Sequence, residues 1–109
     1  MAAKYEIKTG RTGKFTFNLI AGNGQKLFTS EAYESRAAAN KGIESVRKNA
    51  GNDARFERKA AKDKSPFFVL KASNGEPLGR SETYSSTSAM EKGIRSVQKN
   101  AGARVVDAK

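Results

Sequence analysis

The sequence predicts an α+β domain of two tandem βββαβ repeats, which form one antiparallel sheet with both helices packed on one face. Three observations carry this prediction. The length of 109 residues suits one compact domain and is too short for two ordinary ones. A shift of 51 positions aligns residues 23–51 with residues 74–102, and 17 of these 29 pairs are identical. Within each copy the hydrophobic period changes from two residues to the period of a helix.

The repeats divide a single domain that spans residues 1–109. We expect repeat one to cover about residues 4–54 and repeat two about residues 55–107. Repeated units of this size usually cannot bury their apolar faces alone. The two copies are therefore expected to share one core across a pseudo-twofold axis.

Strands are predicted where apolar and polar residues alternate. Residues 4–8 and residues 15–21 show this alternation, and over these segments the match to repeat two thins but persists. A short strand is also expected after each helix, over residues 54–58 and residues 103–107.

A hairpin is predicted at Asn23-Gly24 and again at Asn74-Gly75, because Asn-Gly favours a two-residue type I′ turn. The third strand of repeat one should then run over about residues 25–29. Its counterpart in repeat two contains Pro77 and Gly79, which weaken strand pairing. This strand is therefore expected at an edge of the sheet.

The helices are predicted from their caps and their apolar stripes. Ser35 and Ser86 are suitable N-caps, and Gly51 and Gly102 stand where a left-handed residue commonly ends a helix. Residues at helical spacing form a stripe that should face the sheet, namely Ala39, Ile43, Val46 and Ala50 with Met90, Ile94, Val97 and Ala101.

Gly42 and Gly93 lie inside the two predicted helices, where glycine costs about 1 kcal/mol relative to alanine. Each glycine shares a helix flank with other small residues. Such a flank favours close approach of a backbone, either from the sheet or from the twin helix, over a ligand site.

A two-part motif carries a family resemblance. The run Asn-Gly-x-x-Leu-x-x-Ser-Glu-x-Tyr-x-Ser is followed by Lys-Gly-Ile-x-Ser-Val-x-Lys-Asn-Ala-Gly, and both parts occur twice. Over essentially its full length, the chain resembles the YegP-like family of small uncharacterised proteins. The resemblance implies two three-strand, helix, strand motifs in one antiparallel sheet, with the last strands exchanged between the copies. It implies no activity and no catalytic residues.

The composition excludes several classes of protein. The sequence has no cysteine and no histidine, so it offers no disulfide framework, no thiol nucleophile and none of the commonest metal ligands. We expect no cofactor and no metal. The longest apolar run is residues 67–70, too short for a transmembrane helix, and the first residues do not form a signal peptide. A cytoplasmic protein is therefore expected.

The repeated motif Ser30-Glu31-x-Tyr33-x-Ser35 is the best candidate for a reactive site, and it recurs from Ser81 to Ser86. It could form a polar pocket above a helix N-terminus, where free amides attract anions. Capping and anchoring explain the same residues without a site. We therefore expect a non-enzymatic protein with no catalytic residues.

The net charge of +10 is the feature that suggests a partner. Two helices can cover only one face of the sheet, and alternation sends several cations to the other face beside an aromatic ring. Cations that follow phosphates, with a ring that stacks on a base, favour weak, sequence-tolerant binding of RNA or single-stranded DNA. The candidate residues are Lys4, Lys8, Arg55, Lys59, Phe67 and Lys71.

The same open face supports an alternative hypothesis. Phe67, Val69 and Ile20 have the parity of the basic residues, and exposed apolar side chains of this kind mark protein contacts. They would make the chain a protein-interaction or self-association module. A monomer or a weak homodimer is expected, with no membrane partner.

Overall fold

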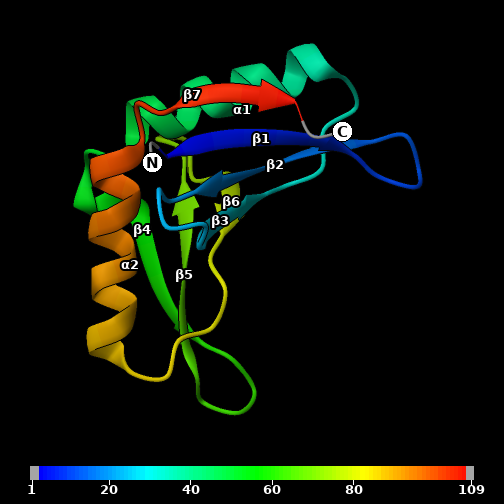
Figure 1. Cartoon of the computed structure of the whole chain (residues 1–109). Coiled ribbons are helices and arrows are strands. Elements are labelled where there is room, and N and C mark those ends of the chain that lie inside the picture. Colours follow the sequence, from blue (N-terminus) through cyan, green and yellow to red (C-terminus); the bar gives the residue numbers. More distant parts are fainter. Residues whose placement is uncertain (1–2, 108–109) are drawn as a thin grey trace.

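The computed structural model describes residues 3–107, which form a seven-stranded sheet and two α-helices (Figure 1). The α+β class and the tandem repeat are confirmed. In chain order the elements are β1 (Lys4–Thr9), β2 (Phe15–Ile20), β3 (Lys26–Ser30), α1 (Arg36–Asn49), the 3-10 helix η1 (Asp53–Arg55), β4 (Phe56–Ala60), β5 (Pro66–Lys71), β6 (Pro77–Arg80), α2 (Thr87–Asn100) and β7 (Arg104–Asp107).

The strands lie in the order β4-β5-β6-β3-β2-β1-β7, so the two repeats meet where β3 pairs with β6. β7 crosses to repeat one and pairs with β1, which is the predicted exchange of a last strand. This pair is parallel, so the sheet is mixed and differs in one ladder from the antiparallel sheet that was expected. Parallel neighbours need a long crossover connection, and here almost the whole chain supplies it.

The prediction that β6 lies at an edge is wrong, because β6 pairs with both β5 and β3. Pro77 is the first residue of β6 and lies outside the pairs with β3, so its missing N–H is not needed there. Gly79 lies opposite Ser30 in the pairing with β3, and a β-carbon on Gly79 would overlap backbone atoms of β3.

One core fills the space between the sheet and both helices. All eight residues of the predicted helix stripes are buried in it, together with the inward side chains of the strands. Aromatic contacts repeat across the pseudo-twofold axis: Tyr5 meets Phe17 edge-on at 5.8 Å, and Phe56 meets Phe68 edge-on at 5.6 Å. The repeats thus build two copies of the same packing into one core, as predicted.

The helix starts agree with the prediction, whereas the helix ends do not. Ser35 Oγ accepts from the Ala38 amide at 3.0 Å, and Ser86 Oγ accepts from the Ala89 amide at 3.1 Å. Gly51 and Gly102 do not have the left-handed conformation that was predicted for them. After each helix the chain instead makes a tight turn. The Asn52 amide donates to the Asn49 carbonyl, and the Ala103 amide donates to the Asn100 carbonyl.

The two Asn-Gly hairpins occur where predicted, but their turn type is different. The Ala21 amide donates to the Gln25 carbonyl and the Gly24 amide donates to the Ala21 carbonyl, which makes a three-residue loop. Only Gly24 is left-handed, with φ of 87°, whereas a type I′ turn also needs a positive φ at Asn23. The Asn23 side chain instead accepts from the Gln25 amide. The loop at Asn74-Gly75 repeats these contacts.

The β4–β5 loop has the same three-residue form but places Lys64 at the left-handed position, with φ of 71°. Its counterpart in the β1–β2 loop is Gly13, with φ of 81°. A side chain in this conformation costs about 1 kcal/mol. We therefore expect Lys64→Gly to raise the free energy of unfolding by about 1 kcal/mol in a urea titration. Lys62→Gly, at an exposed position of the same loop, should leave it unchanged or lower it; equal gains for both variants would contradict the prediction.

Candidate functional site

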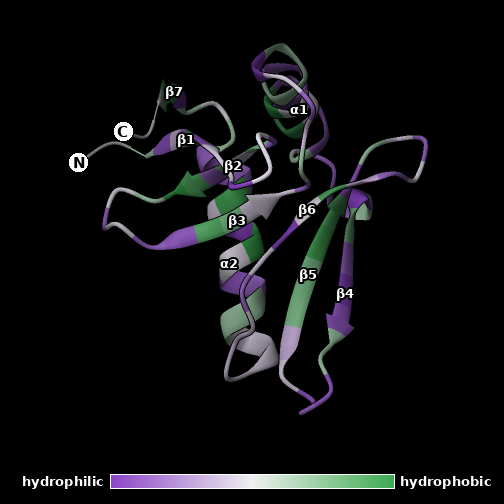
Figure 2. Cartoon of the chain, turned by 90° about the vertical axis from the view of Figure 1, so that its right-hand side faces the viewer, coloured by the Kyte–Doolittle hydropathy of each residue, from purple (hydrophilic) through white to green (hydrophobic). Residues whose placement is uncertain are grey.

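The face of the sheet that the helices leave uncovered carries a cluster of basic and apolar side chains at its repeat-two end. β4 contributes Lys59, β5 contributes Phe67, Val69 and Lys71, and β6 contributes Arg80. Lys59 lies directly opposite Phe67, and Val69 lies directly opposite Arg80. In Figure 2 the hydrophobic length of β5 runs beside the hydrophilic β4. We call these five residues the Phe67 surface.

Two hollows flank the Phe67 surface, and both Phe67 and Arg80 border each of them. The first has a volume of about 420 Å³ and extends over Ala60, Ala61 and Ser81. The second has a volume of about 320 Å³ and is lined also by the other members of the surface, with Glu31 and Glu57. The aromatic ring and the guanidinium therefore stand between two open depressions.

Glu57 sets the charge balance of this surface. Its carboxylate lies 2.7 Å from Lys71 Nζ and 3.9 Å from Lys59 Nζ. The hydrogen bond with Lys71 lowers the pKa of Glu57 below its ordinary value of 4.5, and the charges of both lysines act in the same direction. Arg80 makes no ion pair within 4.0 Å among residues 3–107. One full positive charge of the surface is thus left without a carboxylate partner.

The structure brings together only part of the predicted set of cations. Lys59, Phe67 and Lys71 are neighbours, whereas Lys4 and Lys8 lie on β1, four strands away from β5. At a strand spacing of about 4.8 Å, this separation is about 19 Å. Lys4 also lies 3.9 Å from the carboxylate of Glu6. The two lysines of β1 thus form a separate and partly neutralised group on the same face.

The placement predicted for Arg55 is wrong. Residues 53–55 form η1, so the strand begins at Phe56 and the alternation that put Arg55 on the open face does not reach it. Its Nε donates to the side chain of Asn49 at the end of α1, at 3.1 Å. Asn49 in turn donates to the carbonyl of Ser45, as expected of a group that completes a helix end.

Arg80 is the member of the surface that the sequence did not reveal. Because β6 was expected at an edge of the sheet, no neighbouring strand was predicted to place Arg80 beside other residues of the open face. The pairing of Arg80 with both Val69 and Thr29 places it in the middle of the face. The sequence did contain one signal for Arg80. Arg80 aligns with Thr29 of repeat one, and the alternation along that strand places Thr29 on the open face.

The three apolar residues of the alternative hypothesis do not form one patch. Phe67 and Val69 are two residues apart on β5, but Ile20 lies on β2, with β6 and β3 in between. Arg80 and Thr29 occupy the open face of those two strands. The apolar area around Phe67 is therefore confined to repeat two.

The Ser-Glu-Tyr motifs serve the fold. Ser30 Oγ accepts from the Phe17 amide at 2.8 Å and donates to the Glu31 carbonyl, and Ser81 makes the same two bonds in repeat two. The ring of Tyr33 stacks on Phe17 at 6.1 Å. Burial, followed by the charge of Glu31, raises the pKa of Tyr33 above its ordinary value of 10.0. These contacts leave both serines hydrogen-bonded and the tyrosine protonated at neutral pH.

The close partner of Gly42 and Gly93 is a side chain, whereas a backbone was predicted. A β-carbon on Gly42 would overlap the hydroxyl of Tyr33, and one on Gly93 would overlap that of Tyr84. Each helix glycine thus provides the space for the tyrosine of its own repeat.

Two further observations concern residues 3–107. They contain no group of three acidic side chains close enough together to hold a metal ion. Neither α1 nor α2 combines the length and the apolar character of a membrane-spanning helix.

The comparisons with known proteins agree with the fold. A model for a domain of unknown function, DUF1508, matches twice, over residues 11–57 and 61–107. The UPF0339 protein of Mannheimia succiniciproducens is 49% identical over 102 residues, which cover 94% of this chain and 90% of that protein. The UPF0339 protein YegP of Yersinia pestis is 44% identical and covers 94% and 91%.

Two solution structures are also similar, and one of them is of a protein of unknown function. The YegP structure from E. coli has a TM-score of 0.92 at 40% identity, over 98% of this chain and 93% of the other. The UPF0339 protein of Shewanella oneidensis has a TM-score of 0.91 at 41% identity, over 98% and 92%. The DUF1508 domain is thus present in this chain in two tandem copies. The chain therefore belongs to the UPF0339 family, which includes YegP.

Proposed function

We propose that this chain is a non-enzymatic binding module whose Phe67 surface binds a short single-stranded segment of RNA or DNA, weakly and with little sequence preference. The observation that carries the proposal is the position of Phe67 and Arg80 between two hollows. A base can stack on the ring from one hollow while the neighbouring nucleotide occupies the other. Every base has a face that stacks, so such contacts tolerate different sequences.

Three cations line the same hollow as the Phe67 ring. Lys59 lies opposite Phe67 on β4, Arg80 lies on β6, and Lys71 lies on the same strand as the ring. Glu57 holds Lys71 and Lys59 in place and reduces their net charge. The surface should therefore bind phosphates weakly, and Arg80 should contribute most.

The proposal is tested by fluorescence anisotropy with a labelled oligouridine and a labelled oligothymidine of about 12 nucleotides. Three phosphate contacts on a single strand predict a slope of about −2 for the logarithm of affinity against the logarithm of salt concentration. Arg80→Glu and Lys59→Glu should weaken binding strongly. Phe67→Leu keeps an apolar side chain but removes the stacking ring, so we expect a loss of about 1–3 kcal/mol.

Lys99→Glu is the matched control, because it makes the same charge change at an exposed position of α2. It should weaken binding much less than Lys59→Glu. Lys8→Glu tests whether the contact extends to β1. Absence of binding at low salt, or equal losses for Lys59→Glu and Lys99→Glu, would refute the proposal. Light scattering of wild type and Phe67→Ser at the same concentrations would reveal self-association through this surface.

A further inference from the structure

β4 is the repeat-two counterpart of β1, and the two strands differ in what covers their outer edge. β7 lies along the outer edge of β1, with Tyr5 opposite Val105 and Ile7 opposite Asp107. Among residues 3–107, no strand pairs with the corresponding edge of β4. Within this part of the chain, no strand therefore occupies in repeat two the position that β7 fills in repeat one.

The backbone groups that face this edge can be identified from the neighbouring strand. Phe68 directs its backbone toward β6, because its carbonyl accepts from the Ser81 amide and its amide donates to Ser81 Oγ. Arg58 lies opposite Phe68, and bonding directions alternate along antiparallel strands. Arg58 therefore points its N–H and C=O away from β5, as do Phe56 and Ala60.

Local contacts satisfy the first of these residues. The Phe56 amide donates to the Asp53 carbonyl within η1. The Phe56 carbonyl accepts from Arg58 Nη1 at 3.4 Å. η1 and the Arg58 side chain thus supply to Phe56 the bonds that a neighbouring strand would otherwise supply.

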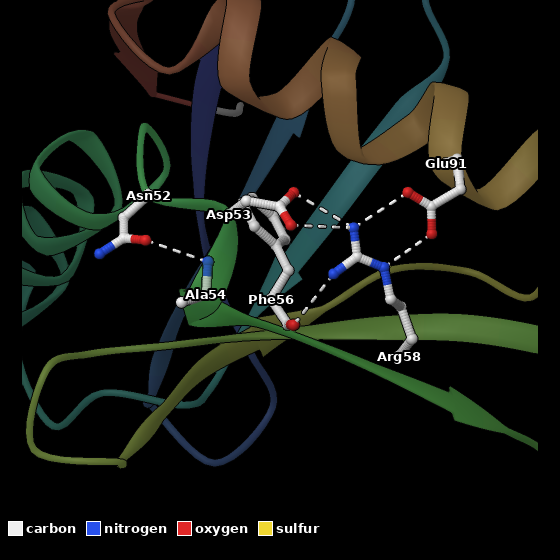
Figure 3. Close-up of polar contacts among 6 residues, drawn as sticks. All are labelled: Asn52, Asp53, Ala54, Phe56, Arg58 and Glu91. Carbon is white, nitrogen blue, oxygen red and sulfur yellow. Dashed lines mark hydrogen bonds and ion pairs between the residues drawn. The ribbon is translucent and has the colours of Figure 1, made fainter.

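The Arg58 side chain is held in this position by two carboxylates (Figure 3). Its Nε and Nη2 donate to the two oxygens of Glu91 on α2, at 2.6 and 2.9 Å. Nη2 also donates to Asp53 at 3.2 Å. The equivalent residue of β1 is Ile7, which is buried, so the charged cluster is specific to the uncovered strand. Charged side chains at a sheet edge oppose pairing with another chain.

We propose that the outer edge of β4 is able to pair with the same edge of a second copy of this chain, and that Arg58, held by Asp53 and Glu91, prevents this pairing in the native chain. Antiparallel pairing of two β4 strands about Arg58 places Glu57 of each copy opposite Lys59 of the other. These opposite charges favour that register. With Arg58 in place, the charged clusters of Arg58, Asp53 and Glu91 from both copies would meet at the contact, so the native chain remains unpaired through this edge.

The test replaces Arg58 with the residue found at the equivalent position of repeat one. Light scattering of Arg58→Ile should show a mass that doubles from 11.8 kDa with concentration, while the wild type keeps that mass. Amide hydrogen exchange should slow at Arg58 and Ala60 positions of the variant as the dimer forms. Arg58→Thr, which is neutral and β-branched, should dimerise without adding a large apolar side chain, and it decides the question if Arg58→Ile does not fold.

Two further variants show whether strand pairing is the cause. Ala60→Pro removes an outward N–H at the end of β4, so the double variant Arg58→Ile/Ala60→Pro should return to the monomer. Lys99→Ile adds the same apolar side chain to the exposed face of α2 and should remain monomeric. The proposal fails if both Arg58 variants are monomeric, if Ala60→Pro does not reverse the association, or if Lys99→Ile associates as strongly.

Discussion

Replacing Gly79 with alanine is expected to lower the free energy of unfolding by about 3 kcal/mol. Gly79 lies where the strands of the two repeats meet, opposite Ser30 of β3. A β-carbon at this position would overlap the Thr29 carbonyl oxygen and lie 2.7 Å from the Ser30 α-carbon. Both are backbone atoms of a central strand, so relief requires β3 and β6 to move apart at their shared ladder.

The repeat explains why glycine is needed here. The residue equivalent to Gly79 in repeat one is Phe28, which is buried in the core. The tip of the Phe28 ring would lie 2.6 Å from a β-carbon on Gly79. The space near the pseudo-twofold axis therefore holds the Phe28 ring only because Gly79 has no side chain. Two large side chains would not fit there.

Urea unfolding of Gly79→Ala and Gly102→Ala tests this explanation. Gly102 does not have a left-handed conformation, and apart from its chain neighbours no residue lies within 4 Å of the place of its missing β-carbon. Its substitution should change stability by less than about 0.5 kcal/mol. Similar effects of the two substitutions would contradict the role assigned to Gly79.

Replacing Tyr5 with phenylalanine is expected to lower the free energy of unfolding by about 2 kcal/mol. The Tyr5 hydroxyl donates to the Ala101 carbonyl at 2.6 Å and is completely buried. Burial raises the pKa of Tyr5 well above its ordinary value of 10.0, so the hydroxyl remains a donor at neutral pH. Its removal leaves a buried carbonyl at the end of α2 without this bond.

This bond matters because it joins β1 to the segment that leads into β7. Arg47 of α1 supports the same region, donating to the Ala103 carbonyl at 2.8 Å and lying over the Tyr5 ring. Tyr33→Phe is the control for thermal and urea unfolding, because Tyr33 as a whole is only half-buried, whereas Tyr5 is completely buried. An unchanged midpoint for Tyr5→Phe would show that Arg47 alone is sufficient to hold this segment.

Sequence patterns predicted the parts of the fold that depend on local periodicity. Alternation around Phe17 and Phe68 identified the buried face, and the Ser35 and Ser86 caps identified the helix starts. These features depend on side chains within a few residues of one another. A shift of 51 positions then made the two halves equivalent.

Features that depend on contacts between distant segments could not be predicted in this way. Pro77 and Gly79 suggested an edge strand, because local preference does not show that β3 supplies the neighbour. Likewise, the packing of Tyr33 against Gly42 depends on how the loop returns over the helix. The conformation of residues 53–55 decided the placement of Arg55, and the alternation rule does not apply to a 3-10 turn.

The candidate site shows the same division. Lys59, Phe67 and Lys71 were found because they lie on two adjacent strands of one repeat. Lys4 and Lys8 share their face but belong to the other half of the sheet, and only the strand order reveals that distance. Arg80 enters the site through its pairing with Val69, which no local pattern indicates.

The pairing of β7 with β1 also affects how the chain can fold during synthesis. Lys4 is synthesised before its partner Arg104, which is added 100 positions later. At about 5–20 residues per second, the edge of β1 stays bare for several seconds while the rest of the domain is made. The edge of β1 is thus covered only when β7 has been made. A chain that stops before residue 104 leaves this edge unpaired, and it lacks a charged residue there because β1 carries Ile7 where β4 carries Arg58.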